Sequence, residues 1–405
     1  MNIPTENTRL TYLYDRLRSV SAGMIDSASS TFLILIAVRA LHADAFSKSL
    51  LAAGGNIGLL ATMWLVPLAA RSRKPAARIA TAILAVGATG FAAAALWPTL
   101  PIYVAGAMLA MACVNLVIPL LTFAYQANYE PRRRGHFVSR ALVIRVAVAA
   151  AAGELGGRIL SADIGYFRWM LAAFGAALAF ASWAIGRMPT QPLPSVESQT
   201  RHSPFHAMRF IRTDRTLRYT LAAWMLMGVA NLMMVPLRVE YLANPRYDLA
   251  LEPQRIALFT IVVPSLVRIV LTPLWGRLFD RMNFFAMRIV LNLGFAIGTA
   301  GFFIGSSDAG LFASAIVFGA AAAGGELAWS LWVTKFSPPQ HVAEYMSVHT
   351  FFTGVRGIIA PFLAFQLVDG VPISTMGLVC AGMIAAASLI LVPEMLQQRR
   401  TSTVV

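Results

Sequence analysis

Six ionisable side chains lie inside long apolar stretches of the sequence. The acids are Asp26, Glu154 and Glu326, and the bases are Arg145, Arg268 and Arg356. A charged group at the centre of a bilayer costs at least about 2.5–3.5 kcal/mol on insertion scales, so such groups usually face a bundle interior or a watery cavity. These six residues are therefore the first candidates for chemistry.

The arginines are candidate anion-binding residues. Arg356 lies near the middle of its apolar stretch, and a guanidinium can hold a carboxylate or phosphate through two parallel hydrogen bonds. Arg268 could supply a second contact to the same anion. The alternative is that acids such as Asp26 or Glu326, or helix C-terminal carbonyls, neutralise both arginines. The predicted substrate-binding residues are Arg356, Arg268, Asn231 and Trp329.

The acids are candidate proton carriers. A partly desolvated carboxyl group can exist as the neutral acid near neutral pH, and so can take up and release a proton. The alternative for each acid is an ion pair or a hydrogen bond between helices, and Asp26 could pair with Asn231 or Arg145 in this way. The predicted proton-coupling residues are Glu154, Glu326 and Asp26.

These charges are conspicuous because the rest of the chain is so apolar. Of its 405 residues, 58% are hydrophobic and only 13% are charged, about half the ~25% of a soluble domain. A soluble protein of this composition would have too little polar surface to offer water. The composition therefore excludes a soluble enzyme and predicts an all-α integral membrane protein without enzymatic activity.

Twelve apolar stretches are each long enough to cross a bilayer, which takes about 20 helical residues. They are residues 19–41, 46–70, 78–97, 101–126, 142–163, 166–187, 217–242, 254–275, 287–305, 310–335, 347–368 and 371–393. The first 18 residues are polar and are expected to lie outside the first span.

Basic residues gather in alternate loops, for example at residues 71–78, 132–140 and 277–288. This bias accounts for the net charge of +15 and predicts that both termini are cytoplasmic. The same distribution argues against a nucleic-acid partner. Because arginine greatly outnumbers lysine, as in GC-rich bacteria, we expect the inner membrane of a bacterium.

The longest gap between spans divides the chain in two. Residues 188–216 begin with a stretch rich in Pro, Gln and Ser, and Ser203 followed by Pro204 is a typical start of a helix. Arginines then alternate with apolar residues, which predicts a basic amphipathic helix at the inner membrane surface. The predicted units are residues 1–187, the cytoplasmic linker 188–216, and residues 217–405.

The two halves resemble each other. When the first half is shifted by 206 residues, Pro67 and Arg71 coincide with Pro273 and Arg277. Six spans return the chain to the side where it started, so the two repeats have the same orientation. Such repeats favour two six-helix bundles related by an axis along the membrane normal.

One loop carries a recognisable motif, in Gly276-Arg277-Leu278-Phe279-Asp280-Arg281. It resembles the loop signature of the major facilitator superfamily. Gly276 is expected to let two helices approach closely, and Asp280 to lie at the N-terminal dipole of a neighbouring helix. Asn283 stands where the signature has Gly, and asparagine is the next best residue at positive φ. The predicted conformational motif is Gly276, Arg277, Asp280 and Arg281.

The signature is only partly kept. Phe284 and Phe285 stand where it has a basic pair, and the corresponding first-half loop, residues 70–74, keeps basic residues but lacks the Gly and the Asp. The resemblance implies twelve transmembrane helices in two pseudo-symmetric six-helix bundles that rock about a central site. Arginines in spans eight and eleven resemble the arrangement in members that move carboxylates.

The predicted function is secondary transport of a small organic solute by alternating access, coupled to protons, with an organic anion as the solute. One alternative is efflux of drugs or cationic compounds. It is weakened because residues 151–157 lack the proline of the antiporters' span-five motif and residues 103–119 contain no basic residue. A second alternative is a non-transporting membrane sensor or a lipid-handling protein.

No metal-ligand spacing, nucleophile motif or nucleotide-binding loop is present in the sequence, so no cofactor or metal is predicted. Cys113 and Cys380 lie in apolar stretches and are interpreted as small core residues. The expected partners are the solute, protons and membrane lipid, and the protein is expected to be a monomer.

Overall fold

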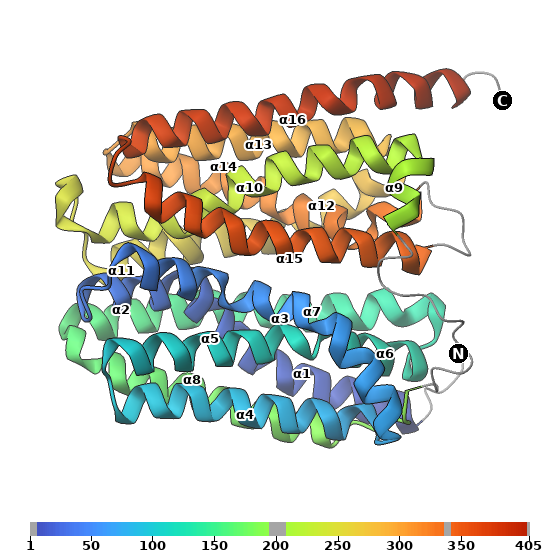
Figure 1. Cartoon of the computed structure of the whole chain (residues 1–405), viewed down its shortest axis with the longest axis horizontal. Coiled ribbons are helices and arrows are strands. Elements are labelled where there is room, and N and C mark those ends of the chain that lie inside the picture. The colour runs from blue at the N-terminus through green and yellow to red at the C-terminus, as the bar shows by residue number, and fades with distance from the viewer. Residues whose placement is uncertain (1–5, 194–207, 336–341, 403–405) are drawn as a thin grey trace. The chain divides into compact units, whose positions relative to one another are not determined.

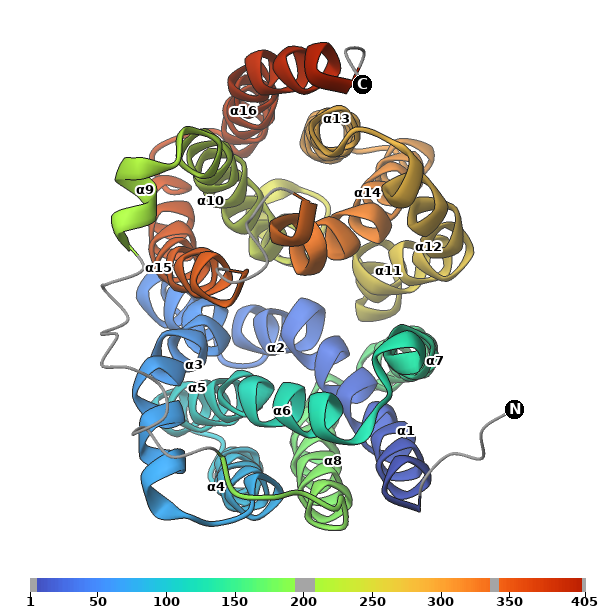
Figure 2. The same ribbon diagram turned by 90° about the vertical axis from the view of Figure 1, so that its right-hand side faces the viewer.

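The computed structural model describes residues 6–193, 208–335 and 342–402 (Figure 1). In these ranges the regular structure is helical, and the helices run as long, roughly parallel rods. Figure 2 shows many of the same helices nearly end-on. The chain divides into two compact units. The first unit contains the described residues of Met1–Arg201 together with Glu252–Ala257, and the second contains those of His202–Leu251 and Leu258–Val405.

The first unit is built from six long helical stretches, some of them interrupted. Its elements are α1 (Glu6–Ser27), the π-helix η1 (Ala28–Phe32), α2 (Leu33–Arg39), α3 (Ala45–Ser72), α4 (Ala76–Leu96), α5 (Leu100–Leu116), α6 (Ile118–Asn128), α7 (Pro131–Ala162), the 3-10 helix η2 (Ile164–Tyr166), α8 (Phe167–Gly186) and the short α11 (Pro253–Ala257).

The second unit repeats this plan after a short α9. Its elements are α9 (Arg209–Thr213), α10 (Arg215–Ala243), η4 (Pro245–Tyr247), the π-helix η5 (Leu258–Val262), α12 (Val263–Arg281), α13 (Phe284–Ile304), α14 (Asp308–Leu331), η6 (Trp332–Lys335), α15 (Val342–Leu367) and α16 (Ile373–Ser402). The helix start predicted at Ser203 lies outside the described residues.

The predicted internal repeat is confirmed by which helices pack together. In the first unit α1 packs on α7 and α8, α3 packs on α5, and α4 packs on α5 and α8. In the second unit α10 packs on α15 and α16, α12 packs on α14, and α13 packs on α14 and α16. Helices at the same place in each half thus make the same pairings.

All twelve predicted spans fall on helices. In the part of the chain that the structure describes, eleven helical stretches are long and apolar enough to cross a membrane. The remaining predicted span lies in the 32-residue α7, whose apolar part carries three charged residues, Arg145, Glu154 and Arg158. Three helices extend further than predicted: α1 begins at Glu6, α7 at Pro131, and α16 ends at Ser402. Helical hydrogen bonds continue beyond the apolar segment, because the polar residues there can be hydrated.

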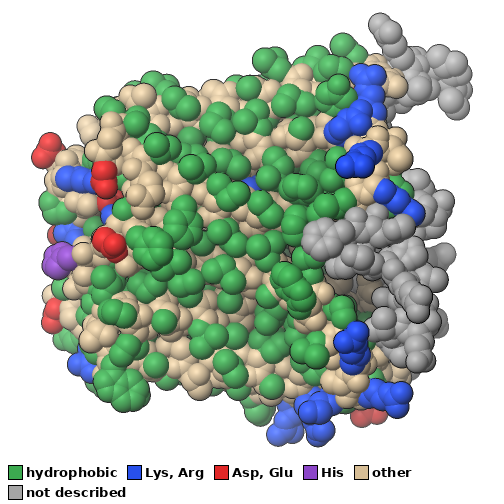
Figure 3. Space-filling view, in the orientation of Figure 1, with side chains coloured by type: hydrophobic (Ala, Val, Ile, Leu, Met, Phe, Trp, Pro, Cys, Tyr) green, Lys and Arg blue, Asp and Glu red, His purple; other side chains and the backbone are tan. Residues whose placement is uncertain are grey.

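Hydrophobic side chains cover most of the face seen in Figure 3, while lysines and arginines gather towards its ends. Large apolar residues are openly exposed along the helices, including Trp64 at 69% and Leu389 at 72%. On a soluble protein such surfaces would be an aggregation hazard, but in a bilayer they face lipid chains.

Several helices begin at a side chain that caps the free backbone amides. Asp44 accepts a hydrogen bond from the Ser47 amide at the start of α3, and Asp214 accepts one from Leu217 at the start of α10. Asn283 does the same for α13 with a φ of −57°. The prediction that Asn283 takes a positive φ is therefore wrong, because its side chain serves as a helix cap.

The predicted role of Gly276 is also wrong for this structure. A methyl group built on Gly276 would meet no atom of the described residues within 4 Å, so this glycine does not bring two described helices together. Close approach occurs elsewhere, for example between Gly90 of α4 and Gly106 of α5. There each glycine's missing methyl group would fall within 3 Å of the other's backbone oxygen.

Candidate functional site

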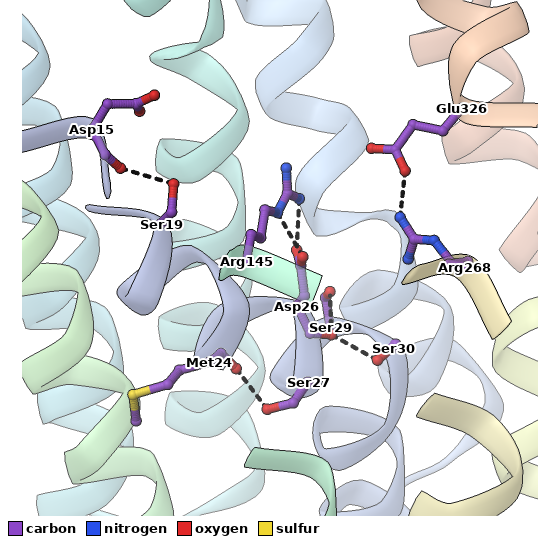
Figure 4. A network of polar contacts seen from close by, with 10 residues as sticks. All are labelled: Asp15, Ser19, Met24, Asp26, Ser27, Ser29, Ser30, Arg145, Arg268 and Glu326. Atoms are coloured by element: carbon purple, nitrogen blue, oxygen red, sulfur yellow. Dashed lines mark hydrogen bonds and ion pairs between the residues drawn. The ribbon is translucent and has the colours of Figure 1, made fainter. Parts of the chain in front are cut away.

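Asp26 and Arg145 form an ion pair in the first unit. The Arg145 guanidinium donates two hydrogen bonds to the carboxylate, from Nε to Oδ2 at 2.6 Å and from Nη2 to Oδ1 at 2.7 Å (Figure 4). The pair joins α1 to α7, which confirms one of the two partners considered for Asp26. The side chains are 31% and 41% exposed, so the pair lies at a polar surface within the span.

This ion pair borders a cavity of about 90 Å³ inside the first unit. Arg18, Ser21 and Asn115 supply further polar groups to its wall, and the rest is apolar. The π-helix η1 begins two residues after Asp26, and the Asp26 carbonyl accepts a hydrogen bond from Ser30 Oγ at 2.6 Å. π-Helical turns occur frequently at functional sites, because they redirect side chains.

Glu154 lies in a hydrogen-bonded network between α7 and α11. Its Oε1 accepts hydrogen bonds from Arg158 at 2.7 Å and from Gln254 Nε2 at 2.8 Å. The backbone amide of Gln254 also donates to Ser161 Oγ at 3.0 Å. Glu154 therefore holds α11 against α7, which is the interhelical bond that was the alternative to a proton-carrying role.

Arg268 and Glu326 form an ion pair in the second unit, between a different pair of helices. Arg268 Nη2 on α12 donates a short hydrogen bond to Glu326 Oε2 on α14 (Figure 4). The side chains are 28% and 39% exposed. The alternative in which Glu326 neutralises Arg268 is thus confirmed. As with Asp26 and Arg145, each charge in the span is balanced by its neighbour.

Arg356 lies in a different setting, buried between α15 and α10. Only 5% of it is exposed, and its Nη1 donates a short hydrogen bond to the backbone oxygen of Trp224. The guanidinium occupies space that a side chain at Gly228 would need. Neither of the acids named as a partner pairs with Arg356, since Asp26 binds Arg145 and Glu326 binds Arg268.

Two residues that the sequence analysis did not select lie beside Arg356. Arg288 on α13, interpreted as an inner-loop base, is 2% exposed, and its Cζ lies 3.7 Å from the centre of the Trp224 ring. His349 on α15 is 1% exposed. Arg288 lies on the same helix face as the buried Leu291 and Phe295 of α13. This helical spacing from apolar residues is the sequence signal that could have predicted its burial.

The remaining predicted substrate residues lie in the second unit. The Trp329 ring is 5.7 Å from the His349 ring, so it belongs to the same cluster. Asn231 follows Trp224 and Gly228 on one face of α10, and its buried Oδ1 finds no hydrogen-bond partner within the described ranges.

The loop motif ends α12. Arg277 and Arg281 are exposed there, while the side chain of Asp280 lies outside what the structure describes. The dipole role predicted for Asp280 therefore stays a prediction. Among the described residues, no group of three or more His, Cys, Asp or Glu side chains is placed to hold a metal ion.

A further buried group lies in the first unit, at Arg18. Its Nη2 donates to Asp15 Oδ1 at 2.8 Å, and the Tyr125 hydroxyl donates to the same oxygen at 2.5 Å. Asp15 is 1% exposed. The sequence analysis missed this triad because it placed the first 18 residues outside the membrane.

Comparison with known proteins identifies the family. The family model of the major facilitator superfamily matches residues 19–361, with a second, overlapping match at 245–403. The chain belongs to the major facilitator superfamily, and its fold is the twelve-helix, two-bundle architecture of secondary transporters. A search of curated protein sequences found no match.

Solved structures share this fold at low identity. The nucleoside transporter NupG (D323A mutant) has a TM-score of 0.77 at 15% identity, covering 95% of this chain and 99% of that one. A D-xylose–proton symporter has a TM-score of 0.68 at 16% identity, covering 95% of each chain. The human organic anion transporter MFSD10 has a TM-score of 0.63 at 14% identity, covering 95% of this chain and 98% of that one.

Proposed function

We propose that this secondary transporter moves a small organic anion together with protons. It would act as a monomer in the bacterial inner membrane, with both termini in the cytoplasm. The fold alone does not identify the solute, because the similar structures are named for nucleosides, xylose and organic anions. The choice of an anion therefore depends on the charges inside the spans.

The observation that carries the proposal is the part-exposed ion pair between Arg268 and Glu326. While Glu326 is ionised, it occupies the guanidinium. When Glu326 takes up a proton, its charge disappears and Arg268 can bind a carboxylate or phosphate group instead. When Glu326 loses the proton, the ion pair forms again and displaces the anion. Proton and anion therefore move together.

The pair of Asp26 and Arg145 supports the same chemistry in the first unit. It too is part-exposed, and it borders a cavity. We propose Asp26 as a second proton site. Glu154 keeps its predicted proton role only as a hypothesis to test, because it already holds two hydrogen-bond donors.

The charges favour an anion over a cationic drug. The three acids predicted as proton sites, Asp26, Glu154 and Glu326, each accept hydrogen bonds from a guanidinium. A cationic solute would have to displace an arginine from its carboxylate at every one of these sites. An anion needs only the release of Arg268, which one proton achieves.

Proteoliposomes with an imposed pH gradient test this proposal. Labelled carboxylates, phosphate esters, amines and sugars are offered in parallel. We expect uptake of one of the anionic classes, and we expect Arg268→Gln to lower it at least tenfold. Arg78→Gln, which removes an exposed arginine of α4, is the matched control and should transport normally.

The Glu326→Gln variant tests proton coupling separately from anion binding. A permanently neutral side chain leaves Arg268 free, so exchange of anion across the membrane should continue while accumulation driven by the pH gradient is lost. If Glu326→Gln still accumulates the anion against its gradient, the coupling role is wrong. If amines are transported and no anion is, the cationic efflux alternative replaces this proposal.

A further inference from the structure

A second group of charges lies deeper in the second unit, away from any acid. Four side chains from three helices pack together, and each is at most 5% exposed. They are Arg288 of α13, Arg356 and His349 of α15, and Trp224 of α10. We call these four residues the Arg288–Arg356 cluster. All of them lie inside membrane-spanning stretches.

The members of the cluster touch through the Trp224 indole. The Cζ atoms of Arg288 and Arg356 lie 3.7 Å and 5.7 Å from the centre of that ring. The His349 ring centre is 5.1 Å from it, and the Trp332 ring centre is 5.0 Å from the histidine and 6.1 Å from Trp224. The two guanidinium groups are close enough to repel each other, and both repel a charge on His349.

Several buried polar nitrogens of the cluster lack hydrogen-bond partners among the described residues. Arg356 Nε, Trp224 Nε1 and His349 Nε2 are buried with no hydrogen-bond partner in the described part of the chain. Arg288 Nη2 reaches only the sulfur of Met227, a weak acceptor, at 3.1 Å. Within the same described residues, no carboxylate pairs with Arg288 or Arg356.

Such an arrangement is costly without a compensating negative charge. Burying an ion without a partner costs several kcal/mol even after the protein relaxes, and an unsatisfied buried donor adds to that cost. Stacking on an indole recovers only part of it. Two positive charges and two free donors, Arg356 Nε and Trp224 Nε1, at one indole ring therefore call for an anion that can accept hydrogen bonds from several directions.

We propose that the Arg288–Arg356 cluster is the binding site of a small monovalent anion of halide size, such as chloride. A halide has no preferred direction for accepting hydrogen bonds, and so suits donors from three different helices. Arg356 then serves this resident ion rather than the transported solute, and the site does not depend on the proposed function.

Thermal unfolding of the purified full-length protein in detergent tests the site. The protein is compared in sodium chloride, sodium bromide, sodium sulfate and sodium gluconate at equal ionic strength. We expect chloride and bromide to raise the Tm by about 2 °C at tenfold excess over the dissociation constant. Gluconate and sulfate should not. Equal Tm values in all four salts, or a shift with sulfate alone, would overturn the proposal.

Substitutions test whether the halide-dependent Tm shift arises at the Arg288–Arg356 cluster. Arg288→Gln and Arg356→Gln should lose the halide-dependent shift. Arg238→Gln is the matched control, because Arg238 is a buried arginine of the same unit that stacks on Phe318 at 3.8 Å, and it should keep the shift. Arg268→Gln should keep it as well. If Arg268→Gln abolishes the shift, the ion binds at the transport site and the proposal is wrong.

Two measurements remain informative if the arginine variants do not fold. Trp224→Phe keeps the aromatic ring but removes the indole donor, so the halide concentration for half the Tm shift should rise severalfold. Crystals of the unaltered protein in bromide should show an anomalous scattering peak between Arg288 and Arg356. Absence of that peak under conditions where bromide raises the Tm would place the ion elsewhere and refute the assignment.

Discussion

Arg18 of the first unit, which pairs with the buried Asp15, and Arg288, itself buried in the second, are both arginines of membrane-spanning stretches, yet they are held in opposite ways. Arg18 donates twice to Asp15, and Tyr125 completes the triad. Arg288 lies on an indole ring and a thioether, beside a second arginine. The first unit compensates this buried charge within its own chain, whereas the second, on our proposal, takes its compensation from solution.

The largest effect is expected when Arg18, the partner of the buried Asp15, is removed. Arg18→Leu leaves Asp15 buried without its cation, which should lower the free energy of unfolding by about 3–5 kcal/mol. Reversible denaturant unfolding of the purified protein measures this. Arg9→Leu, which removes an exposed arginine of the same helix, should change stability by no more than about 0.5 kcal/mol. Equal effects of the two variants would contradict the importance of the triad.

Overpacking at Gly228 should have the next largest effect. An added methyl group would fall within 3 Å of three atoms of the Arg356 guanidinium, so Gly228→Ala should cost about 1–3 kcal/mol and weaken the halide-dependent shift. Gly382→Ala in α16 is the control, because nothing lies within 4 Å of its new methyl group. There the higher helix propensity of alanine should leave stability unchanged or raise it.

Arg288→Leu sharpens the comparison with Arg18→Leu. In halide-free gluconate buffer this variant removes a charge that has no carboxylate partner among the described residues, so no buried acid is exposed by the change. We expect the free energy of unfolding to rise in that buffer, because the variant removes a buried charge without a carboxylate partner in the described chain. In chloride, the unaltered protein should be the more stable of the two. A loss in gluconate as large as that of Arg18→Leu would show that Arg288 is compensated within the chain.

The smallest effect is expected at a helix cap. Hydrogen bonds from the Ser47 side chain and amide hold the pKa of Asp44 below its ordinary value. The cap's contribution is therefore complete above about pH 4, and is lost as the pH falls through the lowered pKa of the folded state. Asp44→Ala should cost about 0.5–1 kcal/mol at neutral pH, whereas Asp44→Asn should keep most of the cap and lose its pH dependence.

Asp214 provides the matching cap in the second unit. It accepts the Leu217 amide and also the Tyr345 hydroxyl at 2.6 Å, so it joins α10 to α15 as well as starting a helix. Asp214→Ala should therefore cost more than Asp44→Ala when both are measured by the same unfolding assay. Equal costs would mean that the bond to Tyr345 contributes nothing measurable.

The helices and the repeat were predictable because they depend on local composition. Twenty apolar residues in a row require a helix in lipid wherever they occur, and Pro67 and Pro273 mark the same place in both halves. The candidate charges inside the spans were also found, since an ionised group in an apolar run is conspicuous. Arg18 and Arg288 were missed because they lie close to the ends of the predicted spans, where a basic residue is ordinarily solvated.

By itself the sequence determined that this chain crosses a membrane many times, in two similar halves, and that six charges would be stranded in the apolar stretches. Tertiary structure alone decided which charges meet, because the sequence does not state which helix faces another. In the folded protein Asp26 pairs with Arg145, and Glu326 pairs with Arg268. Arg356 instead donates to the Trp224 backbone oxygen, beside Arg288 and His349. A buried charge costs little or much according to its neighbour, and in these cases the neighbour lies on another helix, 58 to 132 residues away in the chain.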